Sequence, residues 1–248
     1  MEQSPYHVNY EQVLERASSG ELDATIRTLS EQLPHDWVDA YRLANRTHAN
    51  ILRIKHDGFE YLFDHSSELV LKGKVAKDCA VEDRIVAVHG CSQMAVERRR
   101  DGLMRRHPLG PIDFIKAESD ISKGTAGTYD KGHFIGHSLG GTLHINLFPQ
   151  TTRINRGWSE QGKLFRRMER YCETNPGTYC FSRPIYAGFS GHPEIIEFGV
   201  LKTDGKLWVA QFPNCDTSEE MSTIERLFRA KIAGSDDDNL RSILRPGV

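Results

Sequence analysis

The chain has 248 residues, of which 38% are hydrophobic and 27% charged, a composition typical of a globular protein with one large domain or one domain and an appendage. No run of about 18 apolar residues exists, so the sequence predicts no membrane span. The formal net charge of −2 excludes a uniformly basic nucleic-acid-binding protein, so any phosphate binding has to be local.

The first 55 residues have a helical pattern and no catalytic motif. The start of the chain lacks the basic and apolar regions of a signal peptide, so we expect a cytoplasmic protein or one delivered without a signal peptide. Ser19 can cap a helix whose first turn holds Glu21. Apolar residues then recur at helical spacing: Leu22, Ile26, Leu29 and Leu33. A second helical stretch is expected after Pro34, reaching Ile51, and we interpret the whole segment as a packing or partner-binding appendage.

After the helical segment the pattern changes to strands. Short β-branched or alternating runs predict strands at 58–63, 68–71 and 84–88. Near the other end of the chain, Asp204-Gly205 is a strong hairpin signal between the predicted strands 195–202 and 206–212. The sequence therefore predicts an α+β fold with a mainly antiparallel sheet, divided into a helical appendage (1–55) and a second domain (56–248).

The rest of the chain holds loops, short extended segments and two helices. Residues 97–129 are polar and loop-rich, and 131–148 hold two short extended segments. A helix is expected from near Thr152 to Cys172, because its apolar residues fall on one stripe. A capping box at 217–220 predicts a last helix, which Gly234 ends, and an acidic tail follows.

The five cysteines are Cys79, Cys91, Cys172, Cys180 and Cys215. An odd number without a signal peptide favours reduced thiols, and no Cys-x-x-Cys pair suggests a structural zinc site. We interpret most of these cysteines as small buried hydrophobic residues.

Two local clusters carry positive charge. Residues 97–106 hold five arginines against two acids, and residues 151–183 hold seven Lys or Arg against three Glu. A charged cluster alone is most often a solvated helix face. The second cluster is of interest because it overlaps a motif.

Residues 136–140 read Gly-His-Ser-Leu-Gly and fit the G-x-S-x-G nucleophile elbow of lipases and esterases. The elbow needs an apolar strand before Ser138 and a helix directly after it. Pro149 would break such a helix, and His192 is the only histidine after residue 144 that could complete a triad. A serine hydrolase using Ser138 is therefore kept as an alternative.

The same region resembles a nuclease family. Asp-Lys-Gly-His at 130–133 resembles the Asp-Arg-Gly-His signature of the sugar-non-specific DNA/RNA endonucleases, which carry a ββα-metal finger. The resemblance continues through Asn-Leu-x-Pro-Gln at 146–150, Ile-Asn-Arg-Gly at 154–157 and Phe-Arg-Arg-Met-Glu at 165–169. Histidine, isoleucine and two glycines at 133, 135, 140 and 141 look like the bacterial toxin branch of that family. The order and spacing of these pieces, over about residues 129–172, carry the resemblance.

The resemblance implies roles for individual residues. His133 would be the general base, since a histidine near neutral pH can accept a proton from water. Asn155 would anchor magnesium, with manganese as the alternative ion, because magnesium takes few protein ligands. Asn146 would orient His133 or contact the water shell of the metal. Three basic residues would bind substrate phosphates: Lys131, Arg156 and Arg167.

The sequence departs from the family at three points. Lys131 replaces the signature arginine. This substitution keeps the positive charge but loses the bidentate hydrogen bonds of a guanidinium to a phosphate. His137 is an additional histidine, which strand alternation would place on the same face as His133, where it could assist catalysis or simply pack. The family glutamate has two candidates, Glu169 and Glu160. We favour Glu169, which requires residues 157–162 to bulge so that the helix proper begins near Lys163.

The expected activity is hydrolysis of DNA and RNA, with nucleic acid as partner and no membrane. The alternatives are a serine esterase and a non-enzymatic nucleic-acid-binding or partner-binding protein. An inhibitor or immunity protein and a second copy of the chain are further candidate partners. A non-specific nuclease endangers its own host, which motivates the hypothesis of a delivered toxin or a defence effector with residues 1–55 as adaptor.

Overall fold

The structure is a computed structural model, and it describes residues 6–17, 21–45, 50–65, 83–94, 129–141, 144–186 and 191–215. The fold is α+β with a mainly antiparallel sheet, as predicted. Several predicted features lie outside the described residues: the strand at 68–71, the basic cluster at 97–106, Cys79, and the C-terminal helix and tail.

Six strands form the central sheet, in the order β1-β2-β3-β6-β7-β8, and every neighbouring pair is antiparallel. Their bounds are β1 Ile51–His56, β2 Phe59–Asp64, β3 Arg84–Cys91, β6 Tyr179–Ile185, β7 Ile195–Leu201 and β8 Leu207–Pro213. The predicted hairpin between β7 and β8 is confirmed, and Gly205 has the left-handed φ of 78° that its turn requires. The sheet separates two hydrophobic cores, one on each of its faces.

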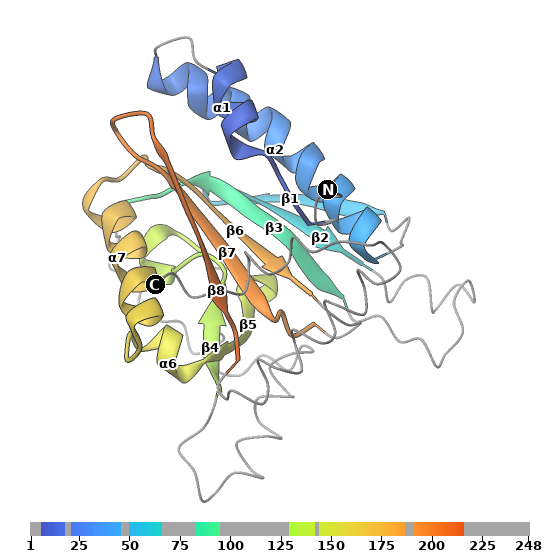
Figure 1. The fold of residues 1–248 in the computed structure, drawn as a ribbon, viewed down its shortest axis with the longest axis vertical. Coiled ribbons are helices and arrows are strands. Elements are labelled where there is room, and N and C mark those ends of the chain that lie inside the picture. The colour runs from blue at the N-terminus through green and yellow to red at the C-terminus, as the bar shows by residue number, and fades with distance from the viewer. Residues whose placement is uncertain are drawn as a thin grey trace, which may run out of the picture.

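Helices α1 (Tyr10–Ala17) and α2 (Leu22–Asn45) cover one face of the sheet (Figure 1). Phe181 of β6 packs against the rings of Tyr10 and Trp37, at centroid distances of 5.3 and 4.9 Å. Gly199 on β7 makes this possible, because an added Cβ would lie 2.2 Å from the Phe181 ring. The N-terminal helices therefore share a core with the sheet.

Two details of the N-terminal prediction are wrong. The helix does not stop before Pro34, because α2 runs through it as one element of 24 residues. Ile51 begins strand β1 instead of extending the second helix, so the predicted boundary between residues 55 and 56 falls inside that strand. β1 pairs with β2 over its full length, and this pairing outweighs the helical pattern at its start.

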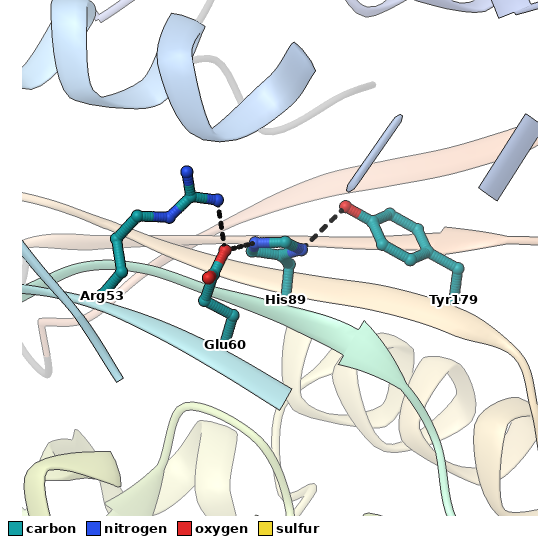
Figure 2. A network of polar contacts seen from close by, with 4 residues as sticks. All are labelled: Arg53, Glu60, His89 and Tyr179. Carbon is teal, nitrogen blue, oxygen red and sulfur yellow. Dashed lines mark hydrogen bonds and ion pairs between the residues drawn. The ribbon is translucent and has the colours of Figure 1, made fainter. Parts of the chain in front are cut away.

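A chain of polar side chains lies under α2 on this face of the sheet (Figure 2). Glu60 contacts Arg53 and binds the Nε2 of His89 at 3.1 Å, while the other ring nitrogen of His89 lies 3.4 Å from the Tyr179 hydroxyl. The hydrogen bond with His89 is the largest influence on Glu60 and holds its pKa at about 2, despite burial that raises it. Trp37 packs edge-on against His89, so the network joins the sheet to the helical cover.

The other face of the sheet carries the finger. Strands β4 (Tyr129–His133) and β5 (Leu147–Thr151) form a separate antiparallel pair, followed by α6 (Thr152–Asn155) and α7 (Glu160–Thr174) (Figure 1). Phe165 of α7 packs against Phe198 and Phe212 of the sheet. The side chain of Asn214 binds the main chain of Thr151, Pro149 and Pro193, which fastens β5 beside the end of β7.

The single helix predicted from Thr152 to Cys172 is two helices. Residues 156–159 interrupt it, and Gly157 has a positive φ of 71°. The predicted interruption therefore exists, but it is shorter than expected, since α7 begins at Glu160 and not near Lys163. Gly162 already lies inside α7 and packs on α6, where an added Cβ would be 2.4 Å from the carbonyl oxygen of Arg153.

Cys172 and Cys180 are buried in the core under the finger, as small hydrophobic residues would be. Cys91 and Cys215 are partly buried, and all four of these thiols are free of disulfide bonds. Across the described ranges, no helix has the length and apolar character needed to cross a membrane.

Candidate functional site

Asp130 on β4 connects the first strand of the finger to the helix that follows. Its carboxylate accepts two hydrogen bonds from the Arg156 guanidinium, both 2.8 Å long, and one from the side-chain Nδ2 of Asn155 at 3.2 Å. Burial raises the pKa of Asp130, but the bonds from Arg156 and Asn155 outweigh it and leave the pKa below its ordinary value. Asp130 is therefore ionised at neutral pH and fixes both side chains.

Asn155 is the last residue of α6 and is partly buried. An amide carries its nitrogen and its oxygen on one carbon, so a nitrogen held by Asp130 directs the oxygen away from that carboxylate. The Asn155 Oδ1 is thus oriented as an acceptor or a metal ligand by a residue on a different element.

His133 is the last residue of β4, opposite Leu147 of β5, and is partly buried. The buried Asn146 fixes the chain directly after it. Its Oδ1 accepts from the main-chain nitrogen of Ile135 and its Nδ2 donates to the Ile135 oxygen, both at 2.9 Å. Gly141 leaves room for this clamp, because an added Cβ would lie 2.0 Å from the Ile135 oxygen. Asn146 therefore positions the main chain beside His133.

Glu169 of α7 faces the turn at Gly136, where its Oε1 would lie 2.9 Å from an added Cβ. Only 8% of its surface is exposed. Burial raises the pKa of Glu169 to about 7, more than the neighbouring Arg166 lowers it, and Glu173 raises it further. Oε2 accepts a hydrogen bond from Arg166 at 3.1 Å. A carboxyl with this pKa can hold or release a proton near neutral pH.

The segment 130–136 joins these two groups of residues. Its first residue contacts Asn155 and its last contacts Glu169, and His133 stands midway between them. Three residues of chain span at most about 10 Å, so His133 lies within about that distance, along the chain, of the residues that contact Asn155 and Glu169. Arg166 of α7 also connects the turn after α6 to Glu169, since its Cγ lies beside Gly157 while its guanidinium binds Glu169.

Three other sequence candidates have surroundings of their own. The exposed Glu160 forms an ion pair with Lys163. The guanidinium of Arg167 stacks on Trp208 of β8, 5.5 Å from the ring centroid. Lys131 is a partly buried residue of β4, opposite Pro149. These contacts of Glu160 and Arg167 involve neither Asp130 nor Glu169, whereas Lys131 follows Asp130 directly on β4.

The expectation that His133 and His137 share one face of a strand is wrong. β4 ends at His133, and His137 opens a short 3₁₀ helix, η1 (His137–Leu139). The strand period of two residues therefore does not extend to His137.

Sequence reasoning missed two residues of the site. Asp130 belongs to the signature, but the sequence analysis gave it no role. Arg166 was passed over in favour of its neighbour Arg167 as a phosphate-binding residue. The signal for Arg166 was present, because it precedes Glu169 by three residues and such pairs meet on a helix surface.

Ser138 does not lie in a nucleophile elbow. It belongs to the three-residue η1, five residues after the end of β4, and Gly140 with a φ of 107° ends that helix. The exposed Ser138 hydroxyl donates to the carboxylate of Glu173. His192, the only histidine that could complete a triad, packs against Tyr129 instead, with ring centroids 4.8 Å apart.

A metal at this site would depend on few protein ligands. In the part of the chain that is described, no three His, Cys, Asp or Glu side chains are grouped to hold a metal ion. A closed zinc site is thus absent there, because such sites take four protein ligands. The oriented oxygen of Asn155 fits a hard, hydrated ion such as magnesium, which keeps most of its waters.

No protein-family model and no curated protein sequence matches the chain. Two solved structures of nucleases resemble it distantly. One is the Sda1 nuclease with a bound zinc ion, with 15% identity over 68% of this chain and 76% of that chain and a TM-score of 0.34. The other is the EndoG/EndoGI complex, in which EndoG is inhibited, with 15% identity over 71% and 83% and a TM-score of 0.37.

Proposed function

We propose that the chain is a metal-dependent endonuclease that hydrolyses the phosphodiester bonds of DNA and RNA. The observation that supports this most is the carboxylate of Asp130, which connects β4 to α6 and directs the Asn155 oxygen away from that carboxylate. His133 follows on the same strand. A strand pair and a helix thus present a histidine and an oriented amide, in the order that the sequence resemblance implies.

His133 is the general base in this proposal. It takes a proton from the attacking water, and a neutral imidazole can do so because its reference pKa lies near about 6.5. Asn146 keeps the chain after His133 in place through Ile135. Rigid support of this kind holds the base at the distance that proton transfer needs.

Asn155 would hold the metal, magnesium or manganese, through its Oδ1. When bound, such an ion stabilises the negative charge that develops on the phosphoryl and leaving oxygens. Asp130 contributes by fixing the amide, as partners of metal ligands commonly do.

Glu169 and Arg166 form the opposite side of the site. Glu169 would bind a water of the metal shell, and its pKa of about 7 lets it exchange a proton near neutral pH. Arg166 is half exposed and offers its remaining donors to a substrate phosphate. Contacts of this type read phosphates and not bases, so we expect little sequence preference and products with 5′-phosphate ends.

The test compares wild type, His133→Ala and Ser138→Ala on plasmid DNA and on RNA, each with magnesium and with a chelator. Wild type and Ser138→Ala should degrade both nucleic acids, since the Ser138 hydroxyl only binds Glu173 on the surface. His133→Ala and chelated wild type should not.

An ester substrate in the same experiment tests the serine hydrolase. If wild type leaves both nucleic acids intact with magnesium or manganese but cleaves the ester, and Ser138→Ala does not, the nuclease proposal is wrong.

A further inference from the structure

Trp158 is an exposed aromatic residue in the turn between α6 and α7. Of its surface, 62% is accessible, and it is the one aromatic among the large hydrophobic residues exposed in the described part of the chain. An indole that stays in water does not contribute the hydrophobic free energy that its burial would provide. A tryptophan in such a position is available to stack on a ligand with an aromatic or apolar face.

The turn that carries Trp158 is well fixed. Its main-chain nitrogen donates to the Arg153 oxygen at 2.9 Å, and the side chain of Ser159 caps the first turn of α7. Gly157 supplies the positive φ that the turn needs. The side chain therefore projects from an ordered element.

The ring itself is also held. The guanidinium of Arg156 lies over it, 5.0 Å from the centroid, and Asp130 fixes that guanidinium with two hydrogen bonds. A guanidinium covers one face of an indole, so the large exposed fraction leaves the opposite face accessible. Arg156 keeps 52% of its side chain exposed, so the stacked pair lies at the protein surface.

The position of the ring connects it to the proposed site. Asp130 binds Arg156 and Asn155 with the same carboxylate, so the stacked pair and the metal-binding amide belong to one cluster. A nucleotide whose phosphate is near Asn155 would place its base within reach of Trp158. Every base has a π-face, so stacking there is independent of sequence.

We propose that Trp158 is a stacking platform for an unpaired base beside the phosphate that is cleaved, and that single-stranded nucleic acid is the preferred substrate. This rests on the proposed nuclease function. Bases in a duplex are already stacked on their neighbours, and a duplex must first be opened before one of them can reach the ring. Trp158 is accordingly a specificity residue and takes no part in proton transfer.

The experiment measures binding separately from cleavage. His133→Ala, which should bind substrate without cutting it, serves as background. It is titrated in the presence of magnesium with an end-labelled oligo-dT strand and with an end-labelled duplex, and the anisotropy of the label measures binding. Stacking on a base quenches indole fluorescence. The chain has three tryptophans, of which Trp37 is buried, so Trp208→Phe is the matched control for the remaining signal.

The expected result is quenching by the single strand that Trp158→Ala abolishes and Trp208→Phe preserves. Trp158→Ala should weaken single-strand binding by about tenfold and duplex binding by less than about twofold, with Trp158→Phe in between. Unchanged thermal melting of Trp158→Ala would establish that the loss is not one of folding.

Equal binding of the single strand with and without Trp158, or an equal loss for single strand and duplex, would overturn this inference. If wild type cleaves nucleic acid with magnesium in that case, the proposed function stands and only the stacking role falls. If wild type cleaves no nucleic acid, the proposed function falls, and this inference falls with it.

Discussion

Glu169 is a buried acid whose surroundings oppose its charge. In the unfolded chain its pKa is near the ordinary 4.5, and in the fold it rises to about 7 because burial outweighs the contact with Arg166. Between these two values the folded protein holds a proton that the unfolded chain releases. The contribution of Glu169 to stability is therefore largest below pH 4.5 and falls as the pH rises through about 7.

Glu169→Gln should remove this pH dependence. Relative to wild type, the variant should gain about 3 kcal/mol of unfolding free energy between pH 5 and pH 8, because a neutral amide has no proton to lose. Urea unfolding at the two pH values measures the difference. Glu160→Gln is the control, since Glu160 is exposed, and its unfolding should respond to pH as wild type does. Equal responses of the two variants would contradict the buried-acid account.

At the residue scale, the sequence could supply candidates but not their contacts. Asn146 stood in a recognisable motif, yet its role depends on the chain reversal that brings Ile135 to it. The choice between Arg166 and Arg167 depends on the rotation of α7. That rotation is set by the break at 156–159, which the sequence placed too far along the chain, at 157–162.

At the element scale, the sequence predicted β2, β3, β7 and β8 with small shifts at their ends, because their patterns are typical of strands. It did not predict β6, which is buried along its whole length, and it assigned the start of β1 to a helix. The finger was harder. A four-residue α6, a turn and a longer α7 together resemble one amphipathic helix, since Ile154 and Phe165 both face the core. The end of β4 at His133 was equally hidden, because no proline or turn signal directly follows it.

The break between α6 and α7 decides which acid serves the site. Glu160 begins α7 and points to solvent, whereas Glu169 lies more than two turns further on, against the turn that follows His133. Glu169→Ala and Glu169→Gln should both lower nuclease activity strongly, while Glu160→Ala should stay within about twofold of wild type. Initial rates on plasmid DNA with saturating magnesium give the ranking.

Measuring both activity and stability of the same variants distinguishes a loss of catalysis from a loss of folding. Glu169→Gln should lose activity at pH 8, where it is more stable than wild type, so unfolding cannot explain the loss. A greater loss in Glu160→Ala than in Glu169→Ala would assign the metal-shell acid to Glu160.

At the scale of the whole molecule, the helical cover and the finger lie on opposite faces of one sheet (Figure 1). The helical cover and the finger could both be recognised in the sequence, but we interpreted residues 1–55 as an appendage. That interpretation came from the change of period near residue 57, and such a change marks the edge of an element as readily as the edge of a domain. The change of period does not show that Trp37 packs on Phe181, which lies far away in the sequence.

Trp37→Ala tests whether the cover is part of the fold. Trp37 is 1% exposed on α2, so its truncation should destabilise the protein by about 3–5 kcal/mol in a single cooperative transition. Leu43→Ala on the same helix is the control, since Leu43 is 69% exposed and its loss should cost within about 0.5 kcal/mol. If residues 1–55 were an independent appendage, Trp37→Ala would leave the main unfolding transition, followed by circular dichroism in urea, unchanged.

The central claim is that His133 accepts the proton of the attacking water, and chemical rescue tests it most directly. His133→Ala should lower the rate of plasmid cleavage by about a hundredfold or more, and added imidazole should restore part of it, increasingly as the pH rises through the pKa of imidazole. Imidazole should leave wild type and Ser138→Ala unaffected. Activity of His133→Ala within about tenfold of wild type, with the large loss found in His137→Ala instead, would contradict the account.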